Sequence, residues 1–309
     1  MTVTVVGPEA EAALDWLAVA HAIEAGHRLP RAQTEDVILR RGPDTLLNRS
    51  AWIEGLGLAV KVATVFPGNA AEGAPTIGGA VNLLSDTDGA LEAVIDFHLV
   101  TRWKTAADSL LGALRLARPD AERVLILGAG PAARSLLDAY GAGFPRARFA
   151  VWSRTRASAE RLAAGREGVE VTGDLEGAVR EADIVASATM ATEPLIRGEW
   201  LRPGAHLDLV GAFRPDMREA DDAAVARARV FCDSRRTAGE TGELMAPIAS
   251  GALGAGAVIA DHYEPARMRR LSAEEVTLFK NGGGAHLDLM VARHVLDAWR
   301  AARAQVQAG

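Results

Sequence analysis

The sequence has one cysteine, Cys232, in 309 residues. A lone cysteine cannot form a disulfide within its chain, so the cysteine content does not point to an oxidising compartment. The opening residues, MTVTVVGPEAEAALDW, lack the basic head and the continuous apolar run of a signal peptide. No stretch has the uninterrupted apolar length of a membrane helix. These absences predict a cytoplasmic protein that has no membrane partner.

Positive charge is also scarce, because 34 basic side chains face 40 acidic ones and the formal net charge is −6. No lysine- or arginine-rich run offsets this balance, which disfavours nucleic acid as a partner. The seven histidines show no spacing typical of metal ligands, so no metal site is predicted. There is no G-x-S-x-G nucleophile motif, and Cys232 lies in an apolar segment where packing is its simpler role.

What the sequence does contain changes character along the chain. An amphipathic helix is predicted in EAEAALDWLAVAHAIEAGH, and short β-rich segments follow between residues 46 and 101. Gly, Pro, Asn and Asp separate these segments, so consecutive strands should pair antiparallel. The segments are GLAVKVATVF, TIGGAVNLLSD and LEAVIDFHLVT. A helical pattern then runs to Arg118-Pro119.

Beyond Pro119, apolar strand segments alternate with helical ones, which is typical of a parallel sheet covered on both faces. The last segment, AHLDLMVARHVLDAWRAARAQV, predicts a long amphipathic helix that can pack back on the first part. The predicted fold class is α/β, a Rossmann-type doubly wound parallel sheet domain plus a smaller α+β antiparallel-sheet domain. The predicted domains are residues 1–118, completed by 286–309, and residues 119–285.

The segment VLILGAGPAA carries the motif G-x-G-x-x-A at Gly128, Gly130 and Ala133. The first glycine permits a tight turn, the second lets a pyrophosphate approach the backbone, and the small third residue lets helix and strand pack closely. The phosphate would lie at the helix start, where free N–H groups favour an anion. A preceding strand and a following helix supply the context that the motif requires, so a nucleotide site is predicted rather than a plain turn.

The end of the next predicted strand reads VWSRT, with Ser153, Arg154 and Thr155. NAD sites place an acid here to bind the ribose hydroxyls. A guanidinium beside two hydroxyls suits a 2′-phosphate instead, although an arginine on a solvated turn is the alternative. The predicted coenzyme is therefore NADPH, with NADH also considered.

Several cations lie in the predicted antiparallel part. Lys61 interrupts the apolar segment LAVKVATVF, and strand alternation alone allows it to face either solvent or a cleft. Lys104 opens the predicted helix KTAADSLLGALRLA, where its charge opposes the helix dipole; it either holds an anionic substrate or is an ordinary exposed lysine. Arg41 or Arg49 can bind a carboxylate or simply lie on the surface.

Five segments, taken in order, resemble the ornithine cyclodeaminase/mu-crystallin family: AVKVATVFPGN, VTRWKTAADS, VLILGAGPAA, ATEPLIRGEWLRPGAHLDLVGAFRPDMREADD and VTLFKNGGGAHLDL. The similarity runs from about Asp44 to Trp299. The resemblance implies a homodimer that acts on a small imine or amino-acid substrate. It also implies that residues 1–118, completed by 286–309, bind this substrate and form the dimer, and that residues 119–285 bind NAD(P). Within the family, cyclodeaminases convert ornithine to proline and ammonia, whereas mu-crystallin and its bacterial relatives reduce cyclic ketimine carboxylates.

The motifs and the resemblance together imply two sets of site residues. The expected coenzyme contacts are Thr76, Gly128, Gly130, Pro131, Ala132, Ala133, Ser153, Arg154, Thr155, Thr189, Val210, Gly211 and Lys280. The expected substrate contacts are Arg41, Arg49, Lys61, Lys104, Phe213 and Gly283, with Lys61 and Lys104 catalytic.

Two positions depart from the family pattern. Lys104 stands where the family usually has a carboxylate-binding arginine, which keeps the charge but not the bidentate fork. Phe213 stands where cyclodeaminases carry an aspartate that acts on the ornithine amine, and a phenyl ring cannot move a proton.

We therefore expect an NADPH-dependent reductase of a small cyclic imine carboxylate. The proton donor is unassigned, since Asp96, His98 and water all qualify. The alternatives are an ornithine cyclodeaminase or a related amino-acid dehydrogenase, and a non-catalytic small-ligand binder that retains NADPH.

Overall fold

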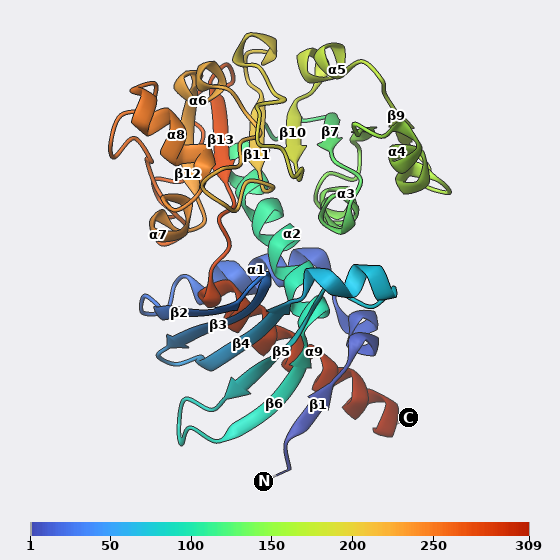
Figure 1. Cartoon of the computed structure of the whole chain (residues 1–309), viewed down its shortest axis with the longest axis vertical. Helices are drawn as coiled ribbons and strands as arrows, with labels where there is room; N and C mark the ends of the chain where they lie inside the picture. Colours follow the sequence, from blue (N-terminus) through green and yellow to red (C-terminus); the bar gives the residue numbers. More distant parts are fainter. Residues whose placement is uncertain (1, 309) are drawn as a thin grey trace. The chain divides into compact units, whose positions relative to one another are not determined.

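The computed structural model describes residues 2–308, which fall into two compact units. Unit 1 contains the chain up to Lys104 and again from Gly284, and unit 2 contains Thr105–Gly283. The division falls inside helix α2 (Phe97–Leu116), whereas the sequence analysis places a boundary after this helix, at Pro119. Each unit is built around its own sheet (Figure 1).

Unit 1 contains a six-stranded sheet in the order β1-β6-β5-β4-β3-β2. Its strands are β1 (Thr4–Val6), β2 (Gln33–Arg41), β3 (Asp44–Ile53), β4 (Gly57–Val65), β5 (Ile77–Leu84) and β6 (Leu91–Asp96). Strands β2 to β6 pair antiparallel, as expected, but β1 pairs parallel with β6. The sheet is therefore mixed, with β1 at one edge and β2 at the other.

Helices α1 (Trp16–Gly26) and α9 (Ala285–Ala308) pack against each other, and α9 also packs against strands β2 to β6 (Figure 1). The single opening helix predicted from the sequence is instead a 3₁₀ turn, η1 (Pro8–Ala13), followed by α1. The break occurs because the Asp15 side chain accepts the N–H of Ala18 and caps α1. A second 3₁₀ segment, η2 (Pro67–Glu72), precedes β5.

Helix α2 begins at Phe97, not at Lys104 as the sequence analysis predicts. Asp96 closes β6, and its Oδ1 accepts the N–H of Leu99 at 2.7 Å, which is the bond of an N-cap. Lys104 therefore lies within the helix, so the prediction that its charge opposes the dipole at the helix start is wrong. His98 is an exposed residue of the first turn, not part of a strand.

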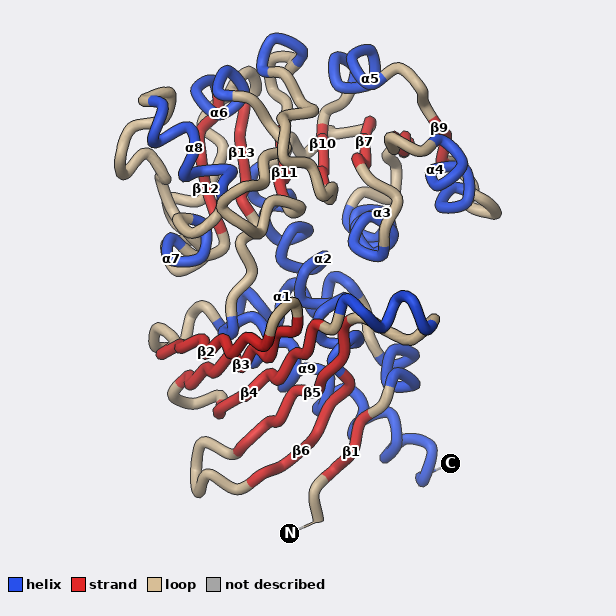
Figure 2. The backbone as a smooth tube through the Cα atoms, viewed as in Figure 1, coloured by secondary structure: helices blue, strands red, loops and turns tan. Residues whose placement is uncertain are grey.

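Unit 2 contains a seven-stranded sheet, and every pairing in it is parallel. Figure 2 shows strands of this sheet in red among the helices and loops of the unit. The order is β12-β13-β11-β10-β7-β8-β9. The strands are β7 (Arg123–Leu127), β8 (Arg148–Trp152), β9 (Val169–Val171), β10 (Ile184–Ser187), β11 (His206–Leu209), β12 (Ala228–Cys232) and β13 (Val276–Lys280). Successive strands lie to one side of β7 and then to the other, which is the reversal typical of a doubly wound sheet. The predicted fold class is confirmed.

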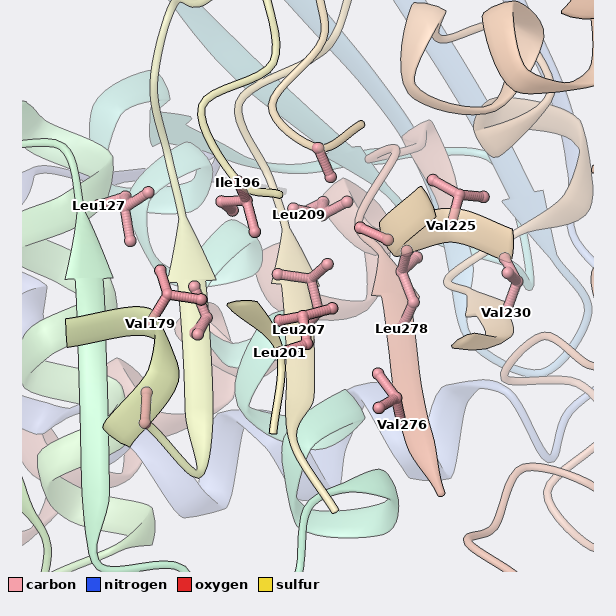
Figure 3. Packing of buried hydrophobic residues seen from close by; sticks show 14 of the residues in the cluster. Leu127, Val179, Ile196, Leu201, Leu207, Leu209, Val225, Val230, Val276 and Leu278 are labelled. Atoms are coloured by element: carbon pink, nitrogen blue, oxygen red, sulfur yellow. The ribbon is translucent and has the colours of Figure 1, made fainter. Parts of the chain in front are cut away.

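The helices of unit 2 connect these strands. They are α3 (Pro131–Gly143), α4 (Arg156–Ala163), α5 (Leu175–Glu181), α6 (Asp222–Arg227), α7 (Arg235–Ala238) and α8 (Gly242–Ser250), with the 3₁₀ turn η3 (Gly198–Trp200). Figure 3 shows Val179 of α5 and Val225 of α6 packed with strand residues such as Leu207. Each fully buried aliphatic side chain contributes about 1.5–3 kcal/mol, so this cluster fixes the sheet on which the site is built.

In the part of the chain that the structure describes, no helix combines the length and apolarity needed to cross a bilayer.

Candidate active site

The turn from β7 into α3 depends on Gly128. Its φ of 108° lies in the region that favours glycine, and a Cβ there would come within 2.6 Å of the Ala188 carbonyl oxygen. Its N–H donates to the Trp152 carbonyl at 2.8 Å, which ties the turn to the end of β8. The fold itself therefore requires this glycine.

Gly130 is different, because neither packing nor conformation requires it. Its φ is −84°, which any residue adopts, and a Cβ there would meet no atom within 4 Å. It is exposed at the N-cap of α3, where no side chain accepts a hydrogen bond from the first helical turn. The open space and the free N–H groups of Ala132 and Ala133 fit a pyrophosphate.

A cleft of about 410 Å³ opens at this turn, at the carboxyl ends of β7, β8 and β10. Six expected coenzyme positions line it: Gly128, Gly130, Ser153, Arg154, Thr155 and Thr189. The lining also includes Met190, which is 66% exposed, and Leu195, neither of which the sequence analysis identifies. Pro131, Ala132 and Ala133 form the first turn of α3 beside the cleft.

A larger groove of about 590 Å³ lies at the other end of the same strands, beside Arg123 and Arg148. Open α/β sheets bind their ligands outside the carboxyl ends of the strands, at the point where the strand order reverses. The smaller cleft at the glycine turn meets both conditions, so it is the candidate coenzyme site.

Arg154 and Arg156 lie close together after β8 but differ in their partners. Arg156 binds Glu160 one turn later, with its Nε 2.9 Å from the carboxylate. Arg154 is exposed, lines the cleft, and has no acidic partner within residues 2–308. Its guanidinium is therefore available to an anionic ligand.

Glu219 joins the loops that follow β10 and β11. Its carboxylate accepts hydrogen bonds from the Ser187 hydroxyl, from both the N–H and the hydroxyl of Thr189, and from the N–H of Gly211, at 2.6–2.8 Å. Burial raises the pKa of Glu219, while these bonds and Lys280 oppose the rise. No pattern in the sequence marks this residue, which holds the expected coenzyme positions Thr189 and Gly211 in place.

Five other expected positions lie outside the lining of the cleft: the coenzyme contacts Thr76, Val210, Gly211 and Lys280, and the substrate contact Gly283. Lys280 is fully buried, and its ammonium donates to the carbonyls of Leu209 and Asn281 at 2.9 and 2.8 Å. Val210 follows β11 beside these groups, and the N–H of Gly283 donates to Asp233 at 2.6 Å. Thr76 belongs to unit 1, just before β5.

The second candidate region is a buried group of charges in unit 1. Lys61 is directed to the covered face of β4 and is 5% exposed. Its Nζ lies 2.9 Å from Oδ1 of Asp288 on α9 and 4.7 Å from the centre of the Phe97 ring. The Lys104 Nζ is 3.9 Å from the same carboxylate oxygen. The structure thus places Lys61 and Lys104 around one acid.

The pKa of Lys61 is lowered to about 8, mainly because the side chain is buried; the Asp288 carboxylate opposes this shift, while Lys104 and Arg49 add to it. Burial alone would raise the pKa of Asp288, but Lys104, Lys61 and Arg49 bring it below its usual value. The cluster therefore contains a lysine that changes its charge near neutral pH.

The two candidate arginines lie in different surroundings. Arg49 is paired in register with Lys61 across β3 and β4, and its guanidinium lies 2.9 Å from Asp36 of β2. Arg41 is exposed at the β2–β3 turn and binds Asp44 at 3.0 Å. Of the two, Arg49 belongs to the charge cluster.

Phe213 lies in the loop after β11 and is 56% exposed, with the Arg214 guanidinium 5.6 Å from its ring centre. Cys232 ends β12 in the core, where burial raises the pKa of its thiol. Across residues 2–308, no group of three or more His, Cys, Asp or Glu side chains gathers as metal ligands would.

Comparison with known proteins places this arrangement in a family. Residues 51–303 match the model of the ornithine cyclodeaminase/mu-crystallin family. Δ1-Pyrroline-2-carboxylate reductase of Paracoccus denitrificans is 52% identical over 296 residues, which cover 93% of this chain and 94% of that protein. Ketimine reductase mu-crystallin of Mus musculus is 36% identical over 244 residues, 78% of this chain and 76% of that protein.

Solved structures show the same fold. Thermococcus litoralis Δ1-pyrroline-2-carboxylate reductase, in complex with NADH and L-proline, has a TM-score of 0.88 at 24% identity. The match covers 96% of this chain and 97% of that one. Since the family model spans most of the sequence and the relatives align over most of their length, the chain belongs to the ornithine cyclodeaminase/mu-crystallin family.

Proposed function

We propose that this protein is an NADPH-dependent reductase of a small cyclic imine carboxylate, of the Δ1-pyrroline-2-carboxylate or Δ1-piperideine-2-carboxylate type. The product would be a cyclic amino acid such as proline. The observation that carries the proposal is the buried charge cluster of unit 1, in which Arg49 is offset by Asp36 and one carboxylate serves two lysines. Among these described side chains three cations face two carboxylates, an excess of positive charge that suits a substrate with one carboxylate. The 52% identical reductase supports the same reaction.

In this proposal Lys61 and Lys104 bind the substrate carboxylate, and Arg49 assists them. Lys61 also keeps the imine nitrogen protonated, because a buried ammonium with a pKa of about 8 can hold or release a proton near neutral pH. A reduced nicotinamide, when bound in the cleft at the glycine turn, would supply a hydride to the imine carbon. The nitrogen retains the proton, so the product is an amine.

The preference for NADPH rests on Arg154. An arginine that lines the cleft without an acidic partner can take the 2′-phosphate in a two-pronged bond. Ser153 and Thr155 add hydroxyl donors on either side of it. No carboxylate lines the cleft at the position where an NAD site needs one.

Phe213 argues against ornithine cyclisation as the main reaction. An amine that must be bound and deprotonated needs a charged partner, and a phenyl ring offers only a cation–π contact of about 0.5–2 kcal/mol. A preformed cyclic imine has no such amine.

The homodimer implied by the family remains a prediction. Edge strand β2 exposes three consecutive apolar residues, Val37, Ile38 and Leu39, which another chain could cover. Light scattering on the purified protein measures the oligomeric state directly.

The experiment that tests the function is the oxidation of NADPH and NADH in the presence of each cyclic imine, with proline or its six-membered homologue quantified as product. A parallel reaction with ornithine and NAD, assayed for ammonia, tests the cyclodeaminase. If neither coenzyme is oxidised with any cyclic imine, the proposed function is wrong and a non-catalytic ligand binder is favoured.

A further inference from the structure

All of the lysines in this protein are buried. The sequence has only three, Lys61, Lys104 and Lys280, among 34 basic residues. Their exposed fractions are 5%, 5% and 0%, although lysine is ordinarily among the most exposed residue types. Arginine therefore supplies the basic charge of the surface, and each lysine is a buried ammonium that needs a partner.

Lys280 and the other two lysines obtain their partners differently. Lys280 donates to two backbone carbonyls of its own unit. Lys61 and Lys104 share a single acid, Asp288, which is 1% exposed on α9. Removing one member of a buried ion pair leaves an uncompensated charge, so both lysines depend on this carboxylate.

The two oxygens of Asp288 are used unequally. Oδ1 accepts a hydrogen bond from Lys61 at 2.9 Å, while Oδ2 is buried and has no hydrogen-bond partner within residues 2–308. Lys104 lies 3.9 Å from Oδ1, beyond hydrogen-bond distance. The Asp288 carboxylate therefore binds Lys61 through Oδ1. Its Oδ2 remains an acceptor without a hydrogen-bond partner within residues 2–308.

We propose that Asp288 is a positioning residue that orients Lys61 and holds it in its charged form for the reaction. The Phe97 ring, 4.7 Å from the Lys61 Nζ, supplies the second contact that fixes the ammonium. The inference rests on the proposed function only for its effect on turnover, since the charge of Lys61 can be measured without substrate.

The charged groups around Lys61 have opposite effects on its pKa. Lys104 on α2 and Arg49 on β3 both lower the pKa of Lys61, in addition to burial, and Asp288 is the group that raises it. Asp36 on β2 offsets Arg49 directly. His27 of α1 and His286 of α9 lie against each other in the same unit, with ring centres 5.3 Å apart.

The protonation state of Lys61 determines whether this side chain can take part in the proposed reaction. Only the protonated form of Lys61 binds a carboxylate and keeps an imine nitrogen protonated. Without Asp288, an ammonium that is buried beside two further cations loses its proton at lower pH. The high-pH side of the activity profile would then move toward neutrality.

The test is an NMR titration of the full-length protein labelled with ¹³C at the lysine Cε positions, from about pH 6 to about pH 11. Three lysines give three signals, and Lys61→Met and Lys104→Met identify two of them. Asp288→Asn removes the charge without changing the shape. Glu92→Gln is the matched control, because it removes a different ion pair to α9, the one between Glu92 and Arg293 at 2.7 Å.

We expect Lys61 to titrate near pH 8 in the wild type, and about one pH unit or more lower in Asp288→Asn. Glu92→Gln should leave the titration unchanged. The high-pH fall of kcat/KM for Δ1-pyrroline-2-carboxylate should move with the NMR titration. An unmoved Lys61 signal in folded Asp288→Asn overturns the inference, as does an equal shift in Glu92→Gln.

If Asp288→Asn does not fold, the comparison is made between Lys104→Met and the double variant Lys104→Met/Asp288→Asn, which carries one fewer buried cation. Lys61 should titrate lower in the double variant, and equal titration contradicts the proposal. Wild-type protein that reduces no imine but shows the expected NMR shift would sink the proposed function and leave the role of Asp288 standing.

Discussion

Arg49 and Lys61 are directly opposite each other across strands β3 and β4, and each is bound by a different carboxylate from another element. Asp36 lies 2.9 Å from Arg49, and Asp288 lies 2.9 Å from Lys61. Like charges in directly paired positions destabilise a sheet, so the two acids are what allow the pair to form. Paired cations on one face of a strand pair are suited to an anionic ligand.

Lys61→Met should fold and lose kcat/KM by about 100-fold or more, because it removes a charged contact to the substrate. Thermal unfolding and imine-dependent NADPH oxidation measure the two effects. Arg41→Met is the matched control, since Arg41 is exposed and binds only Asp44 in the part of the chain described. Unchanged activity in Lys61→Met would show that the lysine has no part in the reaction.

The pH dependence of turnover follows from the lowered pKa of Lys61. The protonated form is the active one, so kcat/KM should be highest below pH 8 and fall above it, instead of above the usual value of 10.5. The decrease approaches about tenfold for each further pH unit. Lys61→Arg, which cannot deprotonate in this range, should lose the fall even if its activity is lower. A profile that stays flat to pH 10 contradicts this assignment.

Gly130→Ala should unfold at nearly the wild-type temperature but bind coenzyme more weakly, because the methyl group enters the space reserved for the pyrophosphate. Gly128→Ala should lower the free energy of unfolding by about 1–3 kcal/mol through backbone strain, and more through its clash with Ala188. Calorimetric unfolding and coenzyme titration distinguish the two. Unchanged coenzyme affinity in Gly130→Ala would place the phosphates elsewhere.

Arg154→Ala should weaken NADPH binding by about 1.5–3 kcal/mol and leave NADH binding nearly unchanged, because only NADPH carries the 2′-phosphate. Arg156→Ala is the control, since Arg156 is already bound to Glu160. The measurement is KM for both coenzymes. Equal losses with NADPH and NADH would mean that Arg154 does not read the phosphate.

Ornithine should give no detectable ammonia with the wild-type protein, because Phe213 provides no base. Phe213→Asp should slow imine reduction by placing an unpaired carboxylate beside an apolar ring. An ammonia assay with ornithine and NAD, run beside imine reduction, makes the comparison. Ammonia release at a rate comparable to imine reduction would reverse the choice between reductase and cyclodeaminase.

The fold could be predicted where the signal is local and repeated. Continuous apolar strands such as RVLIL, alternating with helical segments, are sufficient to indicate a parallel sheet. The start of α2 was wrongly predicted because LEAVIDFHLVT is rich in β-formers, and a single hydrogen bond from Asp96 decides where the helix begins. The start of α2 therefore depends on one aspartate, and the sequence contains many other aspartates that do not begin a helix.

Only the site residues that lie in local sequence motifs could be predicted. The glycine turn is one short continuous segment, and the end of β8 is another. Each can therefore be compared directly with a known sequence motif. Lys61 and Asp288 are 227 residues apart, and no periodicity relates them. Glu219 reaches Thr189 from 30 residues away, again without a local signal. These partners are set by how the chain packs, which a single sequence does not reveal.

The burial of all three lysines makes proteolysis selective. A protease that cuts only after lysine finds no exposed site in the folded chain, whereas one that cuts after arginine finds many. The bond after Lys61 lies in unit 1 and the bond after Lys280 lies in unit 2, whereas the bond after Lys104 joins the two units within α2. The order in which the cuts after Lys61 and Lys280 appear would therefore report which unit opens first, and bound coenzyme should delay the cut after Lys280.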